Sequence, residues 1–323
     1  MGRGWMRSSL TVAVLFLGSL AALVGAPAAQ AWGCKGHQTV ALLAKRHLTP
    51  AAKQMFLALL QSNPVDPKLK RYCGNSSGDE FTDASTWPDD VRQIHPESVP
   101  WHYLDLPRDV KSGPLDPFCG PNGCIVSAME QELALLKDKN AAPAKRADTL
   151  RYLIHFAGDL HSPLHTASNS DRGGNCVPVK YFRRIPHLRN EAYEPNLHHL
   201  WDTEILERAV AGADPAEIAD SLEATFAAEI PRWKQAGIHL EEWVWEGHEH
   251  AEETVYGALS KKVAVEPHVP VSTCADNNNI GDRMLHKHLA IGPAYQEQAA
   301  PVVEERLAQA GIRLAMLLNE AAK

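Results

Sequence analysis

Histidine and aspartate residues recur along the chain at spacings that suit metal binding. His155 and Asp159 lie four residues apart in LRYLIHFAGDL, and His198 and Asp202 repeat this spacing in NLHHLWDTEIL. Because residues i and i+4 lie on one face of a helix, both side chains of a pair can reach one ion. Taken alone, the first pair is better explained as the solvated polar face of a helix. The repetition is what favours a metal centre.

Other residues of the same two types extend this ligand set. His165 follows the first pair, and the remaining candidates lie nearer the N-terminus: His37, Asp89 in TWPDD and His102 in WHYLD. Nitrogen and oxygen ligands without thiolates are typical of zinc in a hydrolase, whereas many structural zinc sites use cysteine. The sequence therefore predicts a hydrolytic zinc centre.

The first residues have the order of a secretory signal peptide. Arg3 and Arg7 precede an apolar run over 11–25, and small residues follow up to Ala29-Gln30-Ala31. The run is short for a bilayer span, so an uncleaved membrane anchor is the weaker alternative. We expect residues 1–31 to be removed, which leaves one mature domain over residues 32–323 in the periplasm or outside the cell.

Cleavage after Ala31 would create one more ligand. A free terminal residue can chelate a metal through its amino nitrogen and its own carbonyl oxygen. The pKa of an α-amino group is about 7.7–8.0, so a metal can displace its proton near neutral pH. We therefore predict that the amino terminus of Trp32 binds metal, and only after processing.

Composition limits the possible partners and predicts disulfides. The chain has 323 residues and a formal charge of −7, so it is a poor general binder of nucleic acid and needs a local positive site for any such activity. Six cysteines in an exported chain predict disulfides. Cys119 and Cys124 are expected to pair with each other, while the pairing of the other four stays open.

Apolar spacing predicts an all-α fold in a single domain with long functional loops. One helix is expected to begin at Thr49-Pro50. Further helices are expected over 126–138, 143–160, 196–209, 215–229, 240–259 and 297–319. Loops are expected at 62–80, 107–123, 166–195 and 260–292, with a short strand pair within 176–183. We interpret 247–250 (GHEH) as exposed helix because it lacks the H-E-x-x-H spacing.

The candidate residues fall in motifs that run through most of the chain after residue 31. These are Trp32-Gly-x3-His37, Trp87-Pro-Asp89, Trp101-His-Tyr-Leu-Asp105, His155-x3-Asp159-x5-His165, Gly173-Gly-Asn175 and Asn196-Leu-His198-x3-Asp202. In this order they resemble the secreted trinuclear-zinc single-strand nucleases of fungi and the bifunctional nucleases of plants. That family shares its mainly helical fold with the zinc-dependent phospholipase C of bacteria.

The resemblance implies three Zn²⁺ ions and a set of ligand residues for each ion. Asp89, His102 and His155 would bind one ion, and Asp159 would bridge it to a second. The second ion would be bound by Trp32 and His37, and the third by His165, His198 and Asp202. The catalytic residues implied are Asp89, Asp159 and Arg92, whose cation would stabilise the transition state.

The resemblance also implies the substrate contacts and the reaction. Tyr103 would stack on a base, Asp105 would contact that base, and Asn175 would lie near the scissile phosphate. The expected activity is an endonuclease that hydrolyses single-stranded DNA and RNA to 5′-phosphate products, with 3′-nucleotidase activity left open. We expect a monomer without a stable protein partner and without membrane attachment after processing.

Two alternative functions remain from the sequence. The first is a phospholipase C on the same scaffold; those relatives carry Glu where this chain has Asp202, which favours the nuclease. The second is a non-catalytic exported zinc-binding protein. It would need closed four-ligand sites, whereas Arg92 and Tyr103 beside the ligands are suited to binding a substrate.

Overall fold

The computed structural model describes residue 1 and residues 32–74, 76–189, 192–259 and 263–323. The predicted signal peptide therefore lies outside the described residues, except for Met1. Within the described part of the chain, no helix is long and apolar enough to cross a membrane. The three disulfides are Cys34–Cys73, Cys119–Cys124 and Cys176–Cys274, which confirms the one predicted pair.

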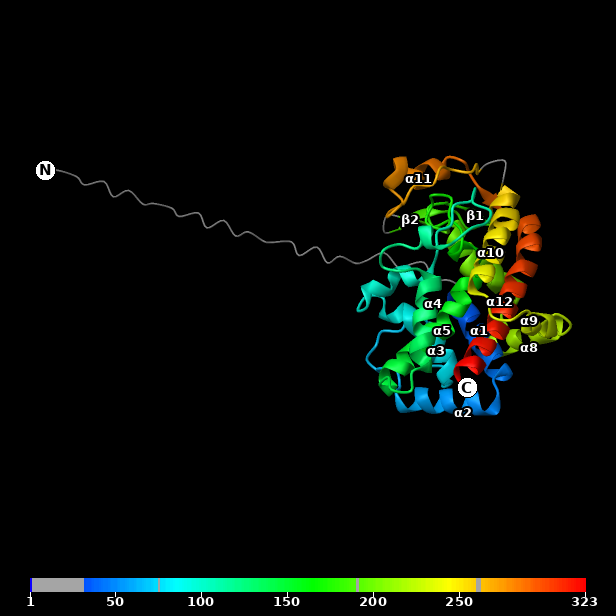
Figure 1. Cartoon of the computed structure of the whole chain (residues 1–323). Helices are drawn as coiled ribbons and strands as arrows, with labels where there is room; N and C mark the ends of the chain where they lie inside the picture. The colour runs from blue at the N-terminus through cyan, green and yellow to red at the C-terminus, as the bar shows by residue number, and fades with distance from the viewer. Residues whose placement is uncertain (2–31, 75, 190–191, 260–262) are drawn as a thin grey trace.

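The fold is built around α5 (Pro143–His161), whose residues from Leu150 to His161 are all buried. Proline at its first position fixes a helical φ where no amide partner is lost. Helices α1 (Gly33–His47), α3 (Glu80–Val91), α4 (Ile125–Lys137), α10 (Leu240–His250) and α12 (Pro293–Ala321) pack around α5. Figure 1 shows α5 in the middle of this bundle, with α3 and α4 beside it. A helix buried on all sides can place polar side chains inside the protein.

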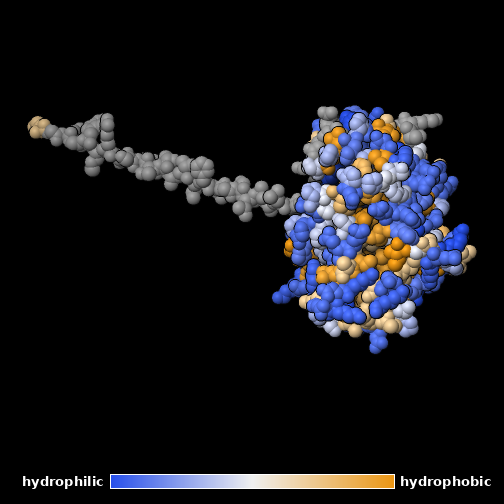
Figure 2. Space-filling view, viewed as in Figure 1, coloured by the Kyte–Doolittle hydropathy of each residue, from blue (hydrophilic) through white to orange (hydrophobic). Residues whose placement is uncertain are grey.

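The remaining helices cover the ends and edges of this bundle. Thr49 caps α2 (Pro50–Ser62) by accepting a hydrogen bond from Ala52 N. Asp214 and Glu217 form a capping box at the start of α8 (Pro215–Thr225), which leads into α9 (Ile230–Ala236). The viewed face is largely hydrophilic, with apolar patches between polar side chains (Figure 2).

Short elements form the end of the molecule that carries α11 (Asp276–Leu285) (Figure 1). Strand β1 (Lys180–Tyr181) pairs in parallel with β4 (Ala290–Ile291), and β2 (His187–Arg189) pairs antiparallel with β3 (Ala192–Glu194). Short 3₁₀ turns lie at η1 (Pro96–His102), η2 (Asp116–Phe118), η3 (Pro163–His165) and η6 (Gly257–Leu259). The mainly helical class is confirmed, but the strand pair expected within 176–183 is wrong, because β1 pairs with residues more than a hundred positions away.

Two predicted helices are interrupted by π turns. The segment expected over 196–209 consists of α6 (Leu197–His199), the π turn η4 (Leu200–Glu204) and α7 (Ile205–Ala209). The segment expected over 240–259 consists of α10, the π turn η5 (Ala251–Tyr256) and the 3₁₀ turn η6. Such bulges are frequent at functional sites, and the first one contains Asp202.

Candidate metal centre

Helix α5 places His155 and Asp159 inside the protein, one turn apart and fully buried. His37 reaches them from α1, and its ring stacks on His155 with centroids 3.9 Å apart. A Cβ at Gly158 would lie 2.9 Å from His37 Nδ1, so glycine is required for this close approach. The polar face of α5 is therefore a buried ligand surface and not a solvated one.

The side chains predicted as metal ligands gather into three neighbouring groups. Within each group, one potential ligand atom per residue lies within 4.8 Å of the others. The groups are His37, His155 and Asp159; Asp89, His102 and His155; and His165, His198 and Asp202. Since His155 belongs to two groups and Asp159 lies 2.8 Å from His102 Nδ1, the first two groups adjoin.

Backbone carbonyl groups fix the orientation of three of these histidines. The Nδ1 atoms of His155, His165 and His198 lie 2.7, 2.7 and 2.6 Å from carbonyl oxygens of Ser85, His102 and Gly173. Each Nδ1–H can donate there, which leaves the Nε2 lone pair directed at the cluster, as in metal sites with an outer hydrogen-bond partner. His102 is reversed: Arg92 Nε donates to its Nε2 at 3.3 Å, so its Nδ1 faces the cluster.

Several buried polar atoms of the cluster lack a regular hydrogen bond in the described structure. They are both ring nitrogens of His37, Asp89 Oδ1, Asp159 Oδ1 and both carboxylate oxygens of Asp202. Of these atoms, His37 Nδ1 and Asp202 Oδ1 have no ion-pair contact among the described residues either. A buried polar atom without a partner costs about 1–3 kcal/mol, and more if it is charged. Cations among these atoms would compensate that cost, so the donor set fits metal ions.

Burial and neighbouring charges prepare His102, His165 and Asp159 in the protonation states that metals require. Burial, with Arg92 nearby, lowers the pKa of His102 to about 3, and burial lowers that of His165 to about 3. Burial alone would raise the pKa of Asp159, but His155 and the surrounding imidazole hydrogen bonds hold it well below its usual value. Neutral imidazoles and an ionised carboxylate are the forms that bind zinc. Elsewhere in the cluster the direction differs: burial would lower the pKa of His155 and of His198, but nearby carboxylates raise it, and burial raises the pKa of Asp202.

Trp32 lies directly against this cluster. Its indole Nε1 donates to Gly158 O at 2.8 Å, and its side chain is fully buried. A Cβ on Gly33 would lie 3.2 Å from Asp202 O. The backbone at the predicted mature terminus is thus enclosed between α5 and the turn that carries Asp202.

The predicted substrate residues line a hollow of about 100 Å³ next to the cluster. Arg92, Tyr103, Asp105 and Asn175 all border it, together with His102, His165 and His198. Arg92 is held by Asp89, with Nη2 2.7 Å from Oδ1. Burial, with Asp171 nearby, raises the pKa of Asp105 to about 7. The hollow combines an exposed aromatic ring, a cation and a hydrogen-bonding carboxyl group beside the ligands.

Comparisons with known proteins agree with this geometry. The profile of the S1/P1 nuclease family matches residues 32–323. The chain belongs to the S1/P1 nuclease family. It is similar to endonuclease 2 of Arabidopsis thaliana, with 26% identity over 92% of each chain, and to nuclease S1 of Aspergillus oryzae, with 28% identity over 93% of this chain and 95% of that protein. Nuclease P1 of Penicillium citrinum is 25% identical over 90% of this chain and 97% of its own.

As an S1/P1 nuclease, the protein is a zinc-dependent hydrolase of phosphodiester bonds that uses three zinc ions. Its three side-chain groups correspond in number to these ions. Family membership therefore decides against the phospholipase C and the non-catalytic alternatives.

Two residues that line the hollow are not among those predicted from the sequence. Arg172 and Val271 line the same hollow as Tyr103. Arg172 directly precedes the Gly173-Gly-Asn175 motif, which could have indicated it. Val271 had no such signal, because its segment is joined to the site by Cys176–Cys274 and by hydrogen bonds from the side chains of Asn169 and Ser170 to backbone carbonyl groups.

The interpretation of 247–250 as exposed helix is right only for Glu249, because Gly247 and His248 are buried and His250 is half-buried. His248 is buried and its Nε2 lies 3.0 Å from Pro107 O, and a Cβ on Gly247 would lie 2.4 Å from Thr166 Oγ1. Helix α10 packs against η3, which carries His165. This stretch therefore packs against the segment that carries the candidate ligand His165.

Proposed function

We propose that the mature protein begins at Trp32 and cleaves single-stranded DNA and RNA, leaving 5′-phosphate ends. The observation that carries this proposal is the hollow bordered both by Tyr103 and by three candidate ligands, His102, His165 and His198. A base stacked on Tyr103 would bring its own phosphate to the metal centre.

The proposed ligands follow the three side-chain groups. Asp89, His102 and His155 would hold one zinc ion, and Asp159 would be shared with a second. The amino terminus and carbonyl of Trp32 would complete the second site with His37, and His165, His198 and Asp202 would hold the third. Zinc supplies a Lewis acid for phosphate oxygens and lowers the pKa of bound water towards 7.

The other residues position the substrate. Arg92 is fixed by Asp89 and His102 at the edge of the hollow, where its positive charge can stabilise the negative charge that develops on the phosphate. Asp105 contacts the edge of the base, and Asn175 lies near the phosphate. Arg92 and the proposed zinc ions supply local positive charge, so the protein can bind a nucleic acid although its net charge is negative.

Single-strand preference follows from the shape of this site. A base must leave its neighbours to enter the hollow and stack on Tyr103, and an unpaired base does so at a lower cost. The preference therefore comes from access to the base and not from reading its sequence.

Export and a monomeric state complete the proposal. Three disulfides fit an oxidising compartment, and the N-terminal pattern fits a cleaved signal peptide. The periplasm and the extracellular medium both meet these conditions.

The test is zinc-loaded protein with a native Trp32 terminus, assayed on single-stranded DNA, single-stranded RNA, duplex DNA and a phosphatidylcholine analogue. We expect cleavage of both single strands, slower cleavage of the duplex and new 5′-phosphate ends. Cleavage of the lipid alone would overturn the proposal, and so would equal rates on single-stranded and duplex DNA.

A further inference from the structure

A buried aspartate outside the ligand set lies in the loop that leads to Asn175. Asp171 is fully buried, and its carboxylate accepts hydrogen bonds from the backbone N–H groups of Asn169 at 3.1 Å and Gly174 at 2.9 Å. Loop 169–175 needs such a constraint, because four of its residues have φ in the left-handed region: Ser170, Arg172, Gly173 and Gly174. Two of these are not glycine, so the loop keeps this shape only while the surrounding contacts impose it.

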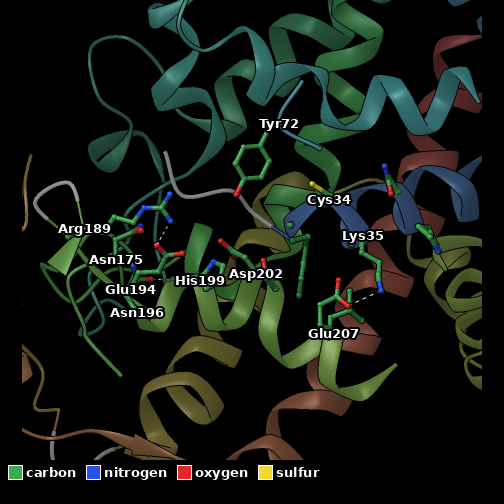
Figure 3. Close-up of a pocket in the computed structure, with 18 of the residues that line it drawn as sticks. Cys34, Lys35, Tyr72, Asn175, Arg189, Glu194, Asn196, His199, Asp202 and Glu207 are labelled. Atoms are coloured by element: carbon green, nitrogen blue, oxygen red, sulfur yellow. Dashed lines mark hydrogen bonds and ion pairs between the residues drawn. The ribbon is translucent and has the colours of Figure 1, made fainter. Parts of the chain in front are cut away.

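The same loop contributes two features to the metal centre. Gly173 O lies 2.6 Å from His198 Nδ1 and so fixes the ring whose Nε2 lies 3.1 Å from Asp202. Asn175, at the end of the loop, borders both the Tyr103 hollow and a larger hollow of about 420 Å³ that Asp202 also lines (Figure 3). The shape of the loop therefore sets the direction of a candidate ligand and the place of a proposed phosphate contact.

A tyrosine from a distant part of the chain makes the third hydrogen bond to this carboxylate. The hydroxyl of Tyr256 lies 3.0 Å from each carboxylate oxygen of Asp171, and the whole tyrosine side chain is buried. Tyr256 is the last residue of the π turn η5. Since π turns are rare and are found mostly at functional sites, this contact gives the second π turn of the protein a role.

Contacts on other sides hold Tyr256 in place. The guanidinium of Arg108 lies 4.4 Å from the centre of the tyrosine ring, and Arg108 Nε donates to Glu252 Oε1 of the same π turn at 2.5 Å. The neighbouring carbonyl, Val255 O, accepts a hydrogen bond from the hydroxyl of Tyr295 in α12 at 2.9 Å. The hydroxyl of Tyr256 therefore acts from a fixed position, as a supporting residue of a site requires.

We propose that Tyr256 and Asp171 are positioning residues for the phosphodiester reaction. Tyr256 holds the carboxylate, the carboxylate holds the loop, and the loop directs His198 and Asn175. Neither supporting side chain is among the described residues that line the two hollows, so the effect on the substrate is indirect. The proposal rests on the proposed nuclease function, because it takes His198 as a zinc ligand and Asn175 as a phosphate contact.

The variant Y256F removes only the hydroxyl that holds Asp171. With zinc-loaded protein and the dinucleoside monophosphate TpT as substrate, we expect kcat to fall about tenfold, as for other disturbed outer-sphere partners. KM should change little, because the Tyr103 hollow keeps its shape. In a titration with chelator, one zinc ion should also leave at about a tenfold lower chelator concentration, because His198 is less well oriented.

The matched control is Y181F. Tyr181 is also buried, and its hydroxyl donates to a side chain of α12, Gln296 Oε1, at 2.6 Å. Its loss should lower the midpoint of urea unfolding as the loss of the Tyr256 hydroxyl does. It should leave kcat and zinc retention as in the wild type, because the broken contact lies outside loop 169–175.

A double variant tests whether Tyr256 acts through Asp171. If it does, adding Y256F to D171A should cause no further fall in kcat or in zinc retention, whereas independent effects would multiply. If D171A does not fold, the comparison of Y256F with Y181F decides alone.

Two outcomes would overturn the positioning role. One is equal kcat and zinc retention in Y256F and Y181F, and the other is effects of Y256F and D171A that multiply in the double variant. If the wild-type protein cleaves TpT and Y256F matches the control, only the positioning role fails. If the wild type cleaves neither TpT nor longer single strands, the proposed function fails, while zinc retention still tests the connection to His198.

Discussion

Replacing Gly158 by alanine tests whether the packing of α5 positions a metal ligand. The added Cβ would lie 2.9 Å from His37 Nδ1, 3.1 Å from His37 Cε1 and 3.5 Å from Trp32 Cδ1. Ordinary contact begins near 3.4 Å, so the His37 ring must move by about half an ångström. It is confined by its stacking on His155 and cannot move freely.

The size of the effect follows from the tolerance of zinc coordination. Ligand distances in metal sites stay within about 0.2 Å of their ideal values. A shift more than twice as large should therefore weaken the site of His37, and we expect about a 10–100-fold loss of affinity there, as for disturbed outer-sphere partners. The assay is zinc content by mass spectrometry after dialysis against graded chelator. Release of the first ion should occur at a lower chelator concentration in G158A than in the wild type.

G311A is the matched control. A Cβ at Gly311 of α12 would meet the Leu43 side chain at 2.8–2.9 Å, an equally tight contact with an apolar group away from the ligands. Overpacking of this kind costs about 1–3 kcal/mol of stability but should leave zinc retention unchanged. The reasoning is refuted if G158A keeps its zinc as the wild type does, or if both variants lose zinc alike.

Three further predictions use other parts of the structure. A protein extended by one residue before Trp32 should contain about one zinc fewer and lose most activity; full metal content with an unchanged rate would contradict the terminal ligand. R92K should lower kcat about 10²-fold with little change in zinc content, since lysine lacks the planar fork; steady-state kinetics and metal analysis check this. Burial would raise the pKa of Glu246, but Arg313 and Arg306 hold it below the usual 4.5. Its stabilising effect is thus present above pH 4.5 and lost as pH falls through the lowered pKa. E246Q should cost about 1 kcal/mol at pH 7, because the carboxylate is more than a third exposed and solvent screens its ion pairs. Urea unfolding should show this difference shrinking at pH 3; a constant difference would contradict it.

Residues with a regular spacing were predictable from the sequence because spacing determines which side chains share a helix face. The i, i+4 pairs His155–Asp159 and His198–Asp202 lie together as expected, with the carboxylate oxygens 3.2 and 3.1 Å from the histidine Nε2 atoms. The Cys119–Cys124 bridge was predictable for a similar reason, since four intervening residues form a small loop.

Elements that depend on distant packing could not be predicted. Helix α1 contains Gly33 and Gly36, which weaken intrinsic helix propensity. It is held by contacts with α12, α3 and α8 and by the Cys34–Cys73 bridge. Helix α11 lies within the loop expected over 260–292 for a comparable reason, because its sequence is rich in asparagine and aspartate.

The buried cluster connects folding of this protein to its cofactor. Among the described residues, two polar atoms of the cluster, His37 Nδ1 and Asp202 Oδ1, have neither a hydrogen bond nor an ion-pair contact. At about 1–3 kcal/mol each, they cost a sizeable part of the roughly 5–15 kcal/mol that stabilises an ordinary domain. The buried arginines of α12 oppose this loss: Arg306 donates to His161 O and to Glu246, and so ties the end of α5 to α10. Ions that bind only the folded state would add stability, so the arrangement that prepares the ligands for catalysis also couples metal binding to the stability of the fold.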